Sequence, residues 1–260
     1  LIKYPYPSSD NGNRKKYNVF HSELDTFVKV MNGCGIKRLD DERPIFARHP
    51  LSYMMEAADD ICYLILDMED AHKRGIVRTS EIEHYFTAFF NNENPDEKWF
   101  YDRRDTVFQT ITDANERIAF LRATVINKLI DCVSKVFVAN YDLIMEGAFS
   151  NSLISHLPDY EKNAMENCRE FSKKNIYRHP SVVKIEVTGF NIIGSLLDDF
   201  VHAVLKPDNS YNKRLLSLIP EQFMTDNDDT YSRIQVVLDF ISNMTDLYAV
   251  QLYKDLRGIE

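Results

Sequence analysis

The sequence predicts an all-α fold, because of its composition and the spacing of its apolar residues. Its 260 residues include only 8 Gly and 9 Pro, which is few for a fold built from many tight turns. Long stretches are rich in Leu, Ile, Met, Glu and Lys, and their apolar residues recur at helical intervals. No internal repeat, low-complexity tract or linker divides the sequence, so we expect one helical domain over residues 1–260.

Start and stop signals predict three helices after an N-terminal loop. Residues 1–19 hold two prolines, an Asn-Gly pair and a basic triplet, which are typical of a loop. Ser22 is a capping residue type, and the helix that it begins is expected to end at Gly33-Cys34-Gly35. A proline at a first helical position and a glycine past the end predict a helix over residues 50–74. The stretch Thr79-Ser80-Glu81 begins the third helix.

The remainder of the chain is predicted to form longer helices and a short pair. Apolar residues recur every three or four positions from residue 104 onward, and prolines mark the starts of later segments. The predicted helices are 104–146, which is nearly unbroken, 159–174, Pro180 to Leu205, two short ones around Pro220, and 230–256. The β-branched residues at 182–187 are also compatible with a local strand.

Composition and charge narrow the class of protein. The formal net charge of −9 does not indicate nucleic acid as a partner, although a local basic pocket can still bind a nucleotide. The sequence contains neither a secretory signal segment nor an apolar run of about 18 residues, so no membrane span is expected. Four widely spaced cysteines without a CxxC pair predict reduced core thiols, as in a cytoplasmic protein.

The predicted helix over 50–74 carries several acidic residues among apolar ones. Asp59, Tyr63 and Asp67 follow one another at intervals of four residues, which places them within an arc of about 80° on one helix face. Two carboxylates beside a phenol can bind a hard cation and the sugar or phosphate end of a ligand. A solvated acidic stripe with an ordinary boundary tyrosine explains the same spacing, and the residues alone leave both interpretations open.

Longer strings around this helix resemble the dGTP triphosphohydrolases, a family of HD-domain phosphohydrolases. These strings are Lys3-Tyr4-Pro5, Lys16, FHSE at 20–23, RHPL at 48–51, EAADDI at 56–61, DMEDA at 67–71 and the apolar segment 236–249. They occur in the family's order and extend over essentially the whole chain. The resemblance implies an all-α, HD-domain-like helical fold, with residues 1–260 as the C-terminal part of a longer triphosphohydrolase.

The resemblance also implies an activity and a cofactor. Family members hydrolyse dGTP or other deoxynucleoside triphosphates to deoxynucleoside and tripolyphosphate, with a divalent metal ion such as Mg²⁺ or Mn²⁺. Their metal is held by a His, an adjacent His-Asp pair and a later Asp, which corresponds here to Asp59.

Substrate-binding residues follow from the same resemblance. Lys3 and Tyr4 match positions that hold the triphosphate, and so does Lys16, for which Lys15 is a competing assignment. Tyr63 is expected at the sugar or phosphates, and Asp67 near the deoxyribose, where close packing can reject a 2′-hydroxyl group.

The rest of the family's metal site is missing from this sequence. None of the seven histidines is followed by aspartate, and in the family the His-Asp pair and the catalytic residues precede the Lys-Tyr-Pro segment. We therefore expect further residues upstream of Leu1 and no activity from this chain alone. A noncatalytic helical nucleotide-binding or assembly module, and an HD-family phosphohydrolase of other specificity, are the alternatives. The resemblance further implies a homo-oligomer and a nucleotide effector.

Overall fold

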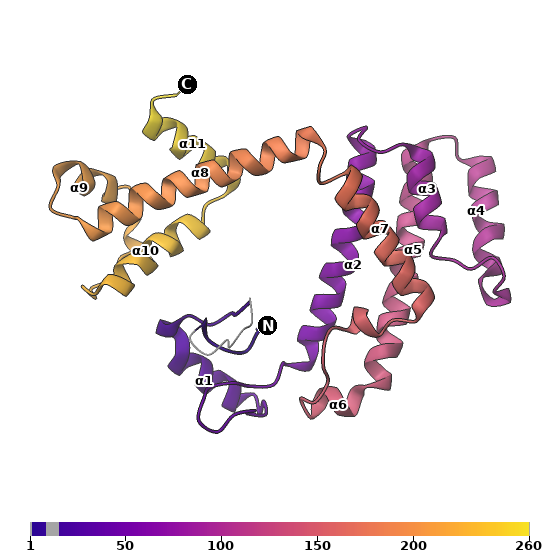
Figure 1. Cartoon of the computed structure of the whole chain (residues 1–260), viewed down its shortest axis with the longest axis horizontal. Helices are drawn as coiled ribbons and strands as arrows, with labels where there is room; N and C mark the ends of the chain where they lie inside the picture. The colour runs from indigo at the N-terminus through magenta and orange to yellow at the C-terminus, as the bar shows by residue number, and fades with distance from the viewer. Residues whose placement is uncertain (1, 9–15, 260) are drawn as a thin grey trace. The chain divides into compact units, whose positions relative to one another are not determined.

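The computed structural model describes residues 2–8 and 16–259 and is helical over most of that length (Figure 1). Extended pairing in the described residues is limited to two isolated bridges, Pro7 with Val19 and Arg38 with Phe46. The all-α prediction is therefore confirmed. Internal contacts divide the chain into two compact units, residues 1–177 and 178–260. The single domain over residues 1–260 stays a prediction.

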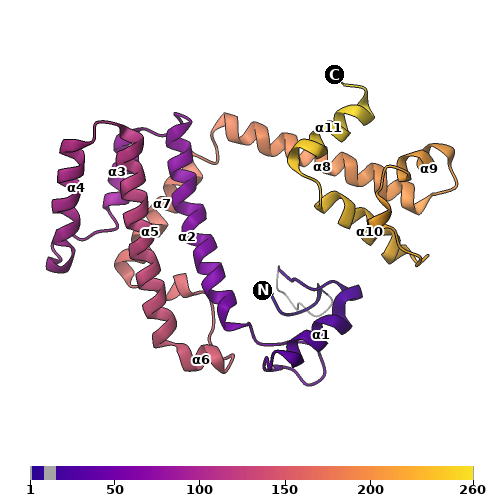
Figure 2. The same cartoon turned by 180° about the vertical axis from the view of Figure 1, so that it is seen from behind.

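The first unit is built around two long helices that pack antiparallel, α2 (Pro50–Lys73) and α5 (Ala114–Ala139). Both views show them side by side, with α3 (Thr79–Thr87) and α7 (Asp159–Asn175) against them (Figures 1 and 2). Their shared core includes Ile61, Ile65, Met68, Ile118, Leu121, Val125 and Leu129. Glu69 of α2 is buried and pairs with Arg122 of α5 across a distance of 2.8 Å, so an ion pair joins the same two helices.

The prediction of one long helix over residues 104–146 is wrong. The structure has three helices there: α4 (Lys98–Thr110), α5 and α6 (Tyr141–Met145). Asp113 is the N-cap of α5, because its side chain accepts a hydrogen bond from the Glu116 N–H at 3.0 Å. The apolar residues keep their helical spacing across the short break, so the spacing alone does not reveal it. The capping residue Asp113 was the signal in the sequence for a new helix.

The N-terminal segment forms a small cluster of its own before α2. It contains a 3₁₀ turn (His21–Glu23) and α1 (Leu24–Gly33), packed through Val19, Phe27, Met31 and Phe46. The predicted cap at Ser22 is not found. The Glu23 carboxylate instead accepts the Phe20 N–H at 3.0 Å at the start of the 3₁₀ turn. Glu23 is also the residue that precedes α1, which has no side-chain cap.

The second unit consists of four α-helices around a separate core. They are α8 (Pro180–Leu205), α9 (Ser210–Leu216), α10 (Thr230–Ser242) and α11 (Asp246–Arg257), with a 3₁₀ turn at Glu221–Phe223. Residues 182–187 are helical, so the strand alternative is wrong. The single helix predicted over 230–256 is broken, because Thr245 accepts the Tyr248 N–H at 3.3 Å and begins α11.

Surface exposure corrects one further expectation. All four cysteines are free, but only Cys168 is buried, whereas Cys132 is half-buried and Cys34 and Cys62 are exposed. The prediction of core thiols is wrong for the last two.

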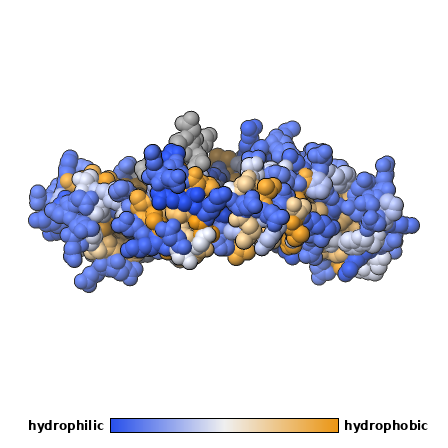
Figure 3. Space-filling model, turned by 90° about the horizontal axis from the view of Figure 1, so that it is seen from below, coloured by the Kyte–Doolittle hydropathy of each residue, from blue (hydrophilic) through white to orange (hydrophobic). Residues whose placement is uncertain are grey.

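Hydrophobic surface remains visible on the face drawn in Figure 3. None of the helices in the described ranges is both long enough and apolar enough to cross a membrane.

Gly147 offers a test of how the N-terminal segment is held against the rest of the first unit. Its φ is +70°, and a methyl group added there would lie 2.5 Å from Cβ of Ala47. We expect Gly147→Ala to lower the free energy of unfolding by about 2–4 kcal/mol, through backbone strain and overpacking together. The measurement is chemical denaturation. Gly75→Ala is the control, since Gly75 has the same φ but open space around it, and should cost about 1 kcal/mol. Equal losses would show that the Ala47 contact is unimportant.

Candidate functional site

Helix α2 is the platform on which the predicted site residues lie. Its first turn is capped by His49, whose Nδ1 accepts the Leu51 N–H at 3.2 Å, and Pro50 occupies the first helical position. The buried residues Ile61, Ile65 and Met68 turn one face toward the core. Because a helix is rigid, this packing directs the opposite face, with Asp59 and Tyr63, toward solvent.

Glu56 attaches the N-terminal segment to this platform. Its carboxylate lies 3.6 Å from Nζ of Lys3 and 2.8 Å from Nη2 of Arg48, and the Glu56 side chain is only 14% exposed. A largely buried carboxylate between two cations holds both in place. The sequence interpretation assigned Glu56 no role, although an acid flanked by Met54, Met55 and Ala57 was a signal for a buried ion pair.

Tyr4 and Lys16 lie beside Lys3. The Tyr4 N–H donates a hydrogen bond to Oδ1 of Asn18 at 2.8 Å. Nζ of Lys3 and of Lys16 lie 5.8 Å and 5.5 Å from the centre of the Tyr4 ring. A hydrogen bond to Tyr4 and the nearby Tyr4 charge raise the pKa of Lys16, so it stays cationic. The structure thus brings together Lys3, Tyr4 and Lys16, whereas Lys15 lies outside the described residues.

The neighbouring carboxylates differ in their surroundings. Asp59 is exposed, whereas Asp60 is half-buried. Burial, and then the charge of Glu56, raise the pKa of Asp60, against an opposing effect of Lys3 and of Arg169 on α7. Among the described residues, no group of three or more His, Cys, Asp or Glu side chains is placed to hold a metal ion. The described residues alone therefore do not fit a complete metal site, and Asp59 offers a single carboxylate.

Tyr63 and Asp67 continue the same face of α2 away from this cluster. Each step of four residues advances about 6 Å along the helix axis. The Tyr63 side chain is 68% exposed. Asp67 is half-buried and accepts a hydrogen bond from the Tyr177 hydroxyl at 2.8 Å. Burial and the Asp67 charge raise the pKa of Tyr177, which keeps it protonated as a donor. Tyr177 was missed by the sequence interpretation, because 110 residues separate it from Asp67.

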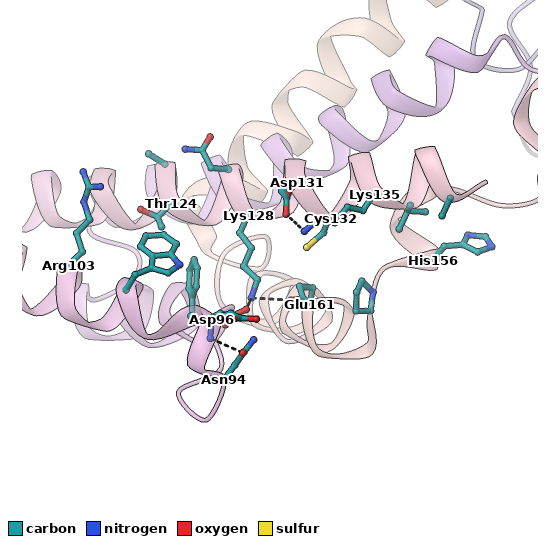
Figure 4. Close-up of a pocket in the computed structure, with 18 of the residues that line it drawn as sticks. Asn94, Asp96, Arg103, Thr124, Lys128, Asp131, Cys132, Lys135, His156 and Glu161 are labelled. Carbon is teal, nitrogen blue, oxygen red and sulfur yellow. Dashed lines mark hydrogen bonds and ion pairs between the residues drawn. The ribbon is translucent and has the colours of Figure 1, made fainter. Parts of the chain in front are cut away.

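A separate cleft of about 1110 Å³ lies elsewhere in the first unit, along α5 (Figure 4). Its central Lys128 is already paired with Glu97 at 2.6 Å and with Glu161 at 3.0 Å. None of the site residues predicted from the sequence lines this cleft. Neutralisation of Lys128 by two carboxylates makes the cleft a poor candidate for a polyanion, and it does not replace the site on α2.

Comparison with known proteins identifies relatives of almost the entire chain. Residues 156–255 match the phosphohydrolase-associated domain family. A deoxyguanosinetriphosphate triphosphohydrolase-like protein of Synechocystis is 32% identical over 94% of this chain and 53% of its own length. One of Pseudomonas aeruginosa is 28% identical over 99% of this chain and 58% of its own length.

A third relative is named a triphosphohydrolase outright, and not a triphosphohydrolase-like protein. The deoxyguanosinetriphosphate triphosphohydrolase of Salmonella paratyphi A is 26% identical over 98% of this chain and 56% of its own length. The chain therefore spans about half the length of the curated relatives it matches. These matches confirm the resemblance that the strings around α2 indicated.

The raised pKa of Asp60 predicts a dependence of stability on pH. A carboxyl group whose pKa is higher in the folded state stabilises fully only below its unfolded pKa, and this contribution is lost as pH rises through the folded value. We expect Asp60→Asn to be more stable than the wild type at neutral pH, with the difference shrinking as pH falls through the raised folded pKa of Asp60 and levelling off below about 4, the unfolded pKa. Denaturation at several pH values checks this. A wild type that is the more stable protein at neutral pH would contradict it.

Proposed function

The chain is homologous over nearly all of its length to deoxyguanosinetriphosphate triphosphohydrolase-like proteins, and from this premise we propose that it forms part of a metal-dependent triphosphohydrolase. The substrate is dGTP or another deoxynucleoside triphosphate, and the products are the deoxynucleoside and tripolyphosphate. The names of the relatives support this choice of reaction.

The single observation that carries the proposal is the gathering of Lys3, Tyr4 and Lys16, with Lys3 paired to Glu56 of α2. A triphosphate brings several negative charges, and charge-assisted hydrogen bonds from lysines suit it. In the free chain, Glu56 neutralises Lys3 and Arg48. The phosphates then compete with a carboxylate that holds Lys3 in place, so substrate binds to cations that are already positioned.

Asp59 is the residue of this chain that we assign to the metal. A bound Mg²⁺ or Mn²⁺ supplies Lewis-acid polarisation of a phosphoryl oxygen. The exposed Asp59 carboxylate contributes one oxygen ligand, and the other ligands and the catalytic groups come from outside the described residues. This chain by itself is thus proposed to be inactive, as a part of a larger active site.

Tyr63 and Asp67 are assigned to the far end of the substrate. The exposed Tyr63 phenol reaches the sugar or the phosphates. Asp67 faces the deoxyribose, with one oxygen held by Tyr177, which fixes its orientation. A fixed carboxylate leaves little room for an additional hydroxyl group, and such steric rejection favours deoxyribose over ribose.

Asp59→Ala tests the assignment to the metal. In the natural protein that contains this chain, we expect the variant to lose metal-dependent turnover of dGTP, by at least about a thousandfold, since removal of a ligand disrupts the site. The measurement is tripolyphosphate release with Mn²⁺ or Mg²⁺ and a chelator control. Asp105→Ala removes an exposed carboxylate on α4 outside the site and should be as active as the wild type.

Either of two results would contradict the proposal. Near-normal turnover by Asp59→Ala would exclude Asp59 as a ligand. Absence of release from all four deoxynucleotides by the wild type, with activating nucleotides added, would favour a noncatalytic module. Comparable turnover of ribonucleotides or other phosphate esters would indicate a phosphohydrolase of different specificity.

Lys3→Ala tests the phosphate-binding role. We expect KM for dGTP to rise about tenfold or more with a smaller change in kcat, because Lys3 contacts phosphate in the ground state as well as in the transition state. Steady-state kinetics measure both constants. Lys29→Ala, which removes an exposed lysine of α1, is the matched control. An unchanged KM in Lys3→Ala would exclude Lys3 from the substrate site.

A further inference from the structure

The second unit contains a small apolar pocket. The C-terminal end of α8, the end of α9 and the start of α10 converge there, and both views show these helices together (Figures 1 and 2). The pocket has a volume of about 250 Å³. Its apolar lining is formed by Val204, Pro207, Leu216, Ile219, Met224 and Val236. Val204, Ile219 and Val236 are buried, whereas Met224 is 55% exposed, so the inner wall belongs to the packed core and Met224 lies at the rim.

Hydrogen bonds fix the two connecting segments that border the pocket. Asn212 of α9 is buried, and its side-chain amide donates to the carbonyl oxygen of Lys206 at 2.7 Å. This bond holds the turn between α8 and α9, which carries Pro207. In the segment before α10, the Thr225 hydroxyl oxygen accepts the Asn227 N–H at 3.2 Å. Walls held in this way are formed before a ligand arrives, which reduces the entropy lost on binding.

Arg233 of α10 is the cation among the residues that line the pocket. Its Nε donates to Oδ1 of Asp228 at 3.1 Å, and its Nη2 contacts the same oxygen. Its Nη1 lies 3.5 Å from the carbonyl oxygen of Val204. These contacts use part of the five N–H donors of the guanidinium, so a further acceptor can bind the same group.

The two partners of this ion pair differ strongly in exposure. The Arg233 side chain is 31% exposed, whereas the Asp228 side chain is 88% exposed. An ion pair with one partner almost entirely in solvent contributes little to stability, because water and salt compete with it. The Asp228 carboxylate therefore marks the position of an anion on Arg233 without being fixed there, and the carboxylate of a ligand can take the same position.

Size and charge narrow the class of ligand. The volume is about eight times the ~30 Å³ that one water molecule occupies in the liquid, so a chain of about eight carbon atoms fills the pocket. The apolar walls suit such a chain, and the planar guanidinium suits a carboxylate at its end. Asp226, Asp228 and Asp229 are exposed in the segment before α10, and their charge disfavours a ligand with several negative charges.

We propose that this pocket binds a small monocarboxylate with an unbranched apolar tail. The carboxylate lies on Arg233 in place of Asp228, and the tail lies along Leu216, Ile219 and Val236. The site goes beyond the proposed function and does not depend on it, since none of its residues lies on α2 or in the N-terminal segment. Its test measures binding and not turnover, so the two proposals succeed or fail separately.

Isothermal titration of the full chain with butanoate, hexanoate, octanoate and decanoate tests the fit of the tail. Each added CH₂ group should tighten binding about fourfold as far as octanoate, with a dissociation constant of about 0.1–1 mM for octanoate. Decanoate should bind no more tightly than octanoate, because the pocket is then full. Octan-1-ol and octylamine, which lack the anionic end, should bind at least about tenfold more weakly than octanoate.

Three results of this titration would overturn the proposal. The first is the absence of measurable binding by any of the carboxylates. The second is an affinity that keeps rising with tail length beyond octanoate, which indicates adsorption to apolar surface. The third is equal binding of octylamine and octanoate, which excludes a role for the guanidinium.

Two variants with opposite expected effects test the exchange of carboxylates on Arg233. Arg233→Gln should weaken octanoate binding about tenfold or more, through loss of charge-assisted hydrogen bonds. Asp228→Asn should tighten it about threefold, because the competing carboxylate is removed. An ion pair with a purely structural role would not give effects of opposite sign. Weaker or unchanged binding by Asp228→Asn would overturn the proposal, and this exposed position keeps the test valid if Arg233→Gln disturbs the fold.

A second arginine–aspartate pair of the same unit supplies the matched controls. Nη2 of Arg257 lies 2.8 Å from Oδ2 of Asp199, and neither residue lines the pocket. Arg257→Gln and Asp199→Asn make the same chemical changes and should leave octanoate binding at the wild-type level. Circular dichroism confirms that each variant is folded. If the Arg257→Gln variant weakened binding as much as Arg233→Gln, octanoate would not be bound in this pocket and the proposal would be wrong.

Discussion

The rotational setting of α2 determines what the rest of the first unit can present to solvent. Ile61, Ile65 and Met68 are completely or almost completely buried against α5, and the ion pair between Glu69 and Arg122 holds the same two helices together. Turning the helix would expose this core, so the outward direction of Asp59 follows from the packing of residues that have no chemistry of their own. A site built on such a helix is rigid, and this rigidity suits ligands that must meet a metal or a sugar with fixed geometry.

The N-terminal segment depends on α2 in a different way. Its own core is only a small cluster around Phe27 and Phe46, and ion pairs join it to α2. Glu56 lies between Lys3 and Arg48, and Gly147 approaches Ala47 of the same segment closely. The largely buried Glu56 carboxylate also affects the cations that it holds. It keeps Lys3 and Arg48, which would otherwise repel one another, close together at the same carboxylate.

Local signals predicted the elements well, and contacts between distant segments were out of reach. Pro50 and Pro180 marked their helices to within about a residue, because a first-turn proline is set by local backbone geometry. The breaks at Asp113 and Thr245 were missed, since apolar spacing alone does not reveal a cap. On the site, the shared face of Asp59, Tyr63 and Asp67 follows from helical periodicity, and it holds in the structure. Tyr177 and Glu56 could not be placed, because their roles depend on which segments fold back onto α2.

The two apolar stripes of α8 show how a sequence can carry more than one packing requirement in a single helix. The stripe through Leu196 and Phe200 is accounted for by the core of the second unit. The stripe through Val183, Val187 and Phe190 lies outside that core. The match to the phosphohydrolase-associated domain family covers residues 156–255, which include all of α8 and none of the residues assigned to the metal or the phosphates. The residues that we assign to the metal and the phosphates thus lie in the first unit, upstream of the matched segment.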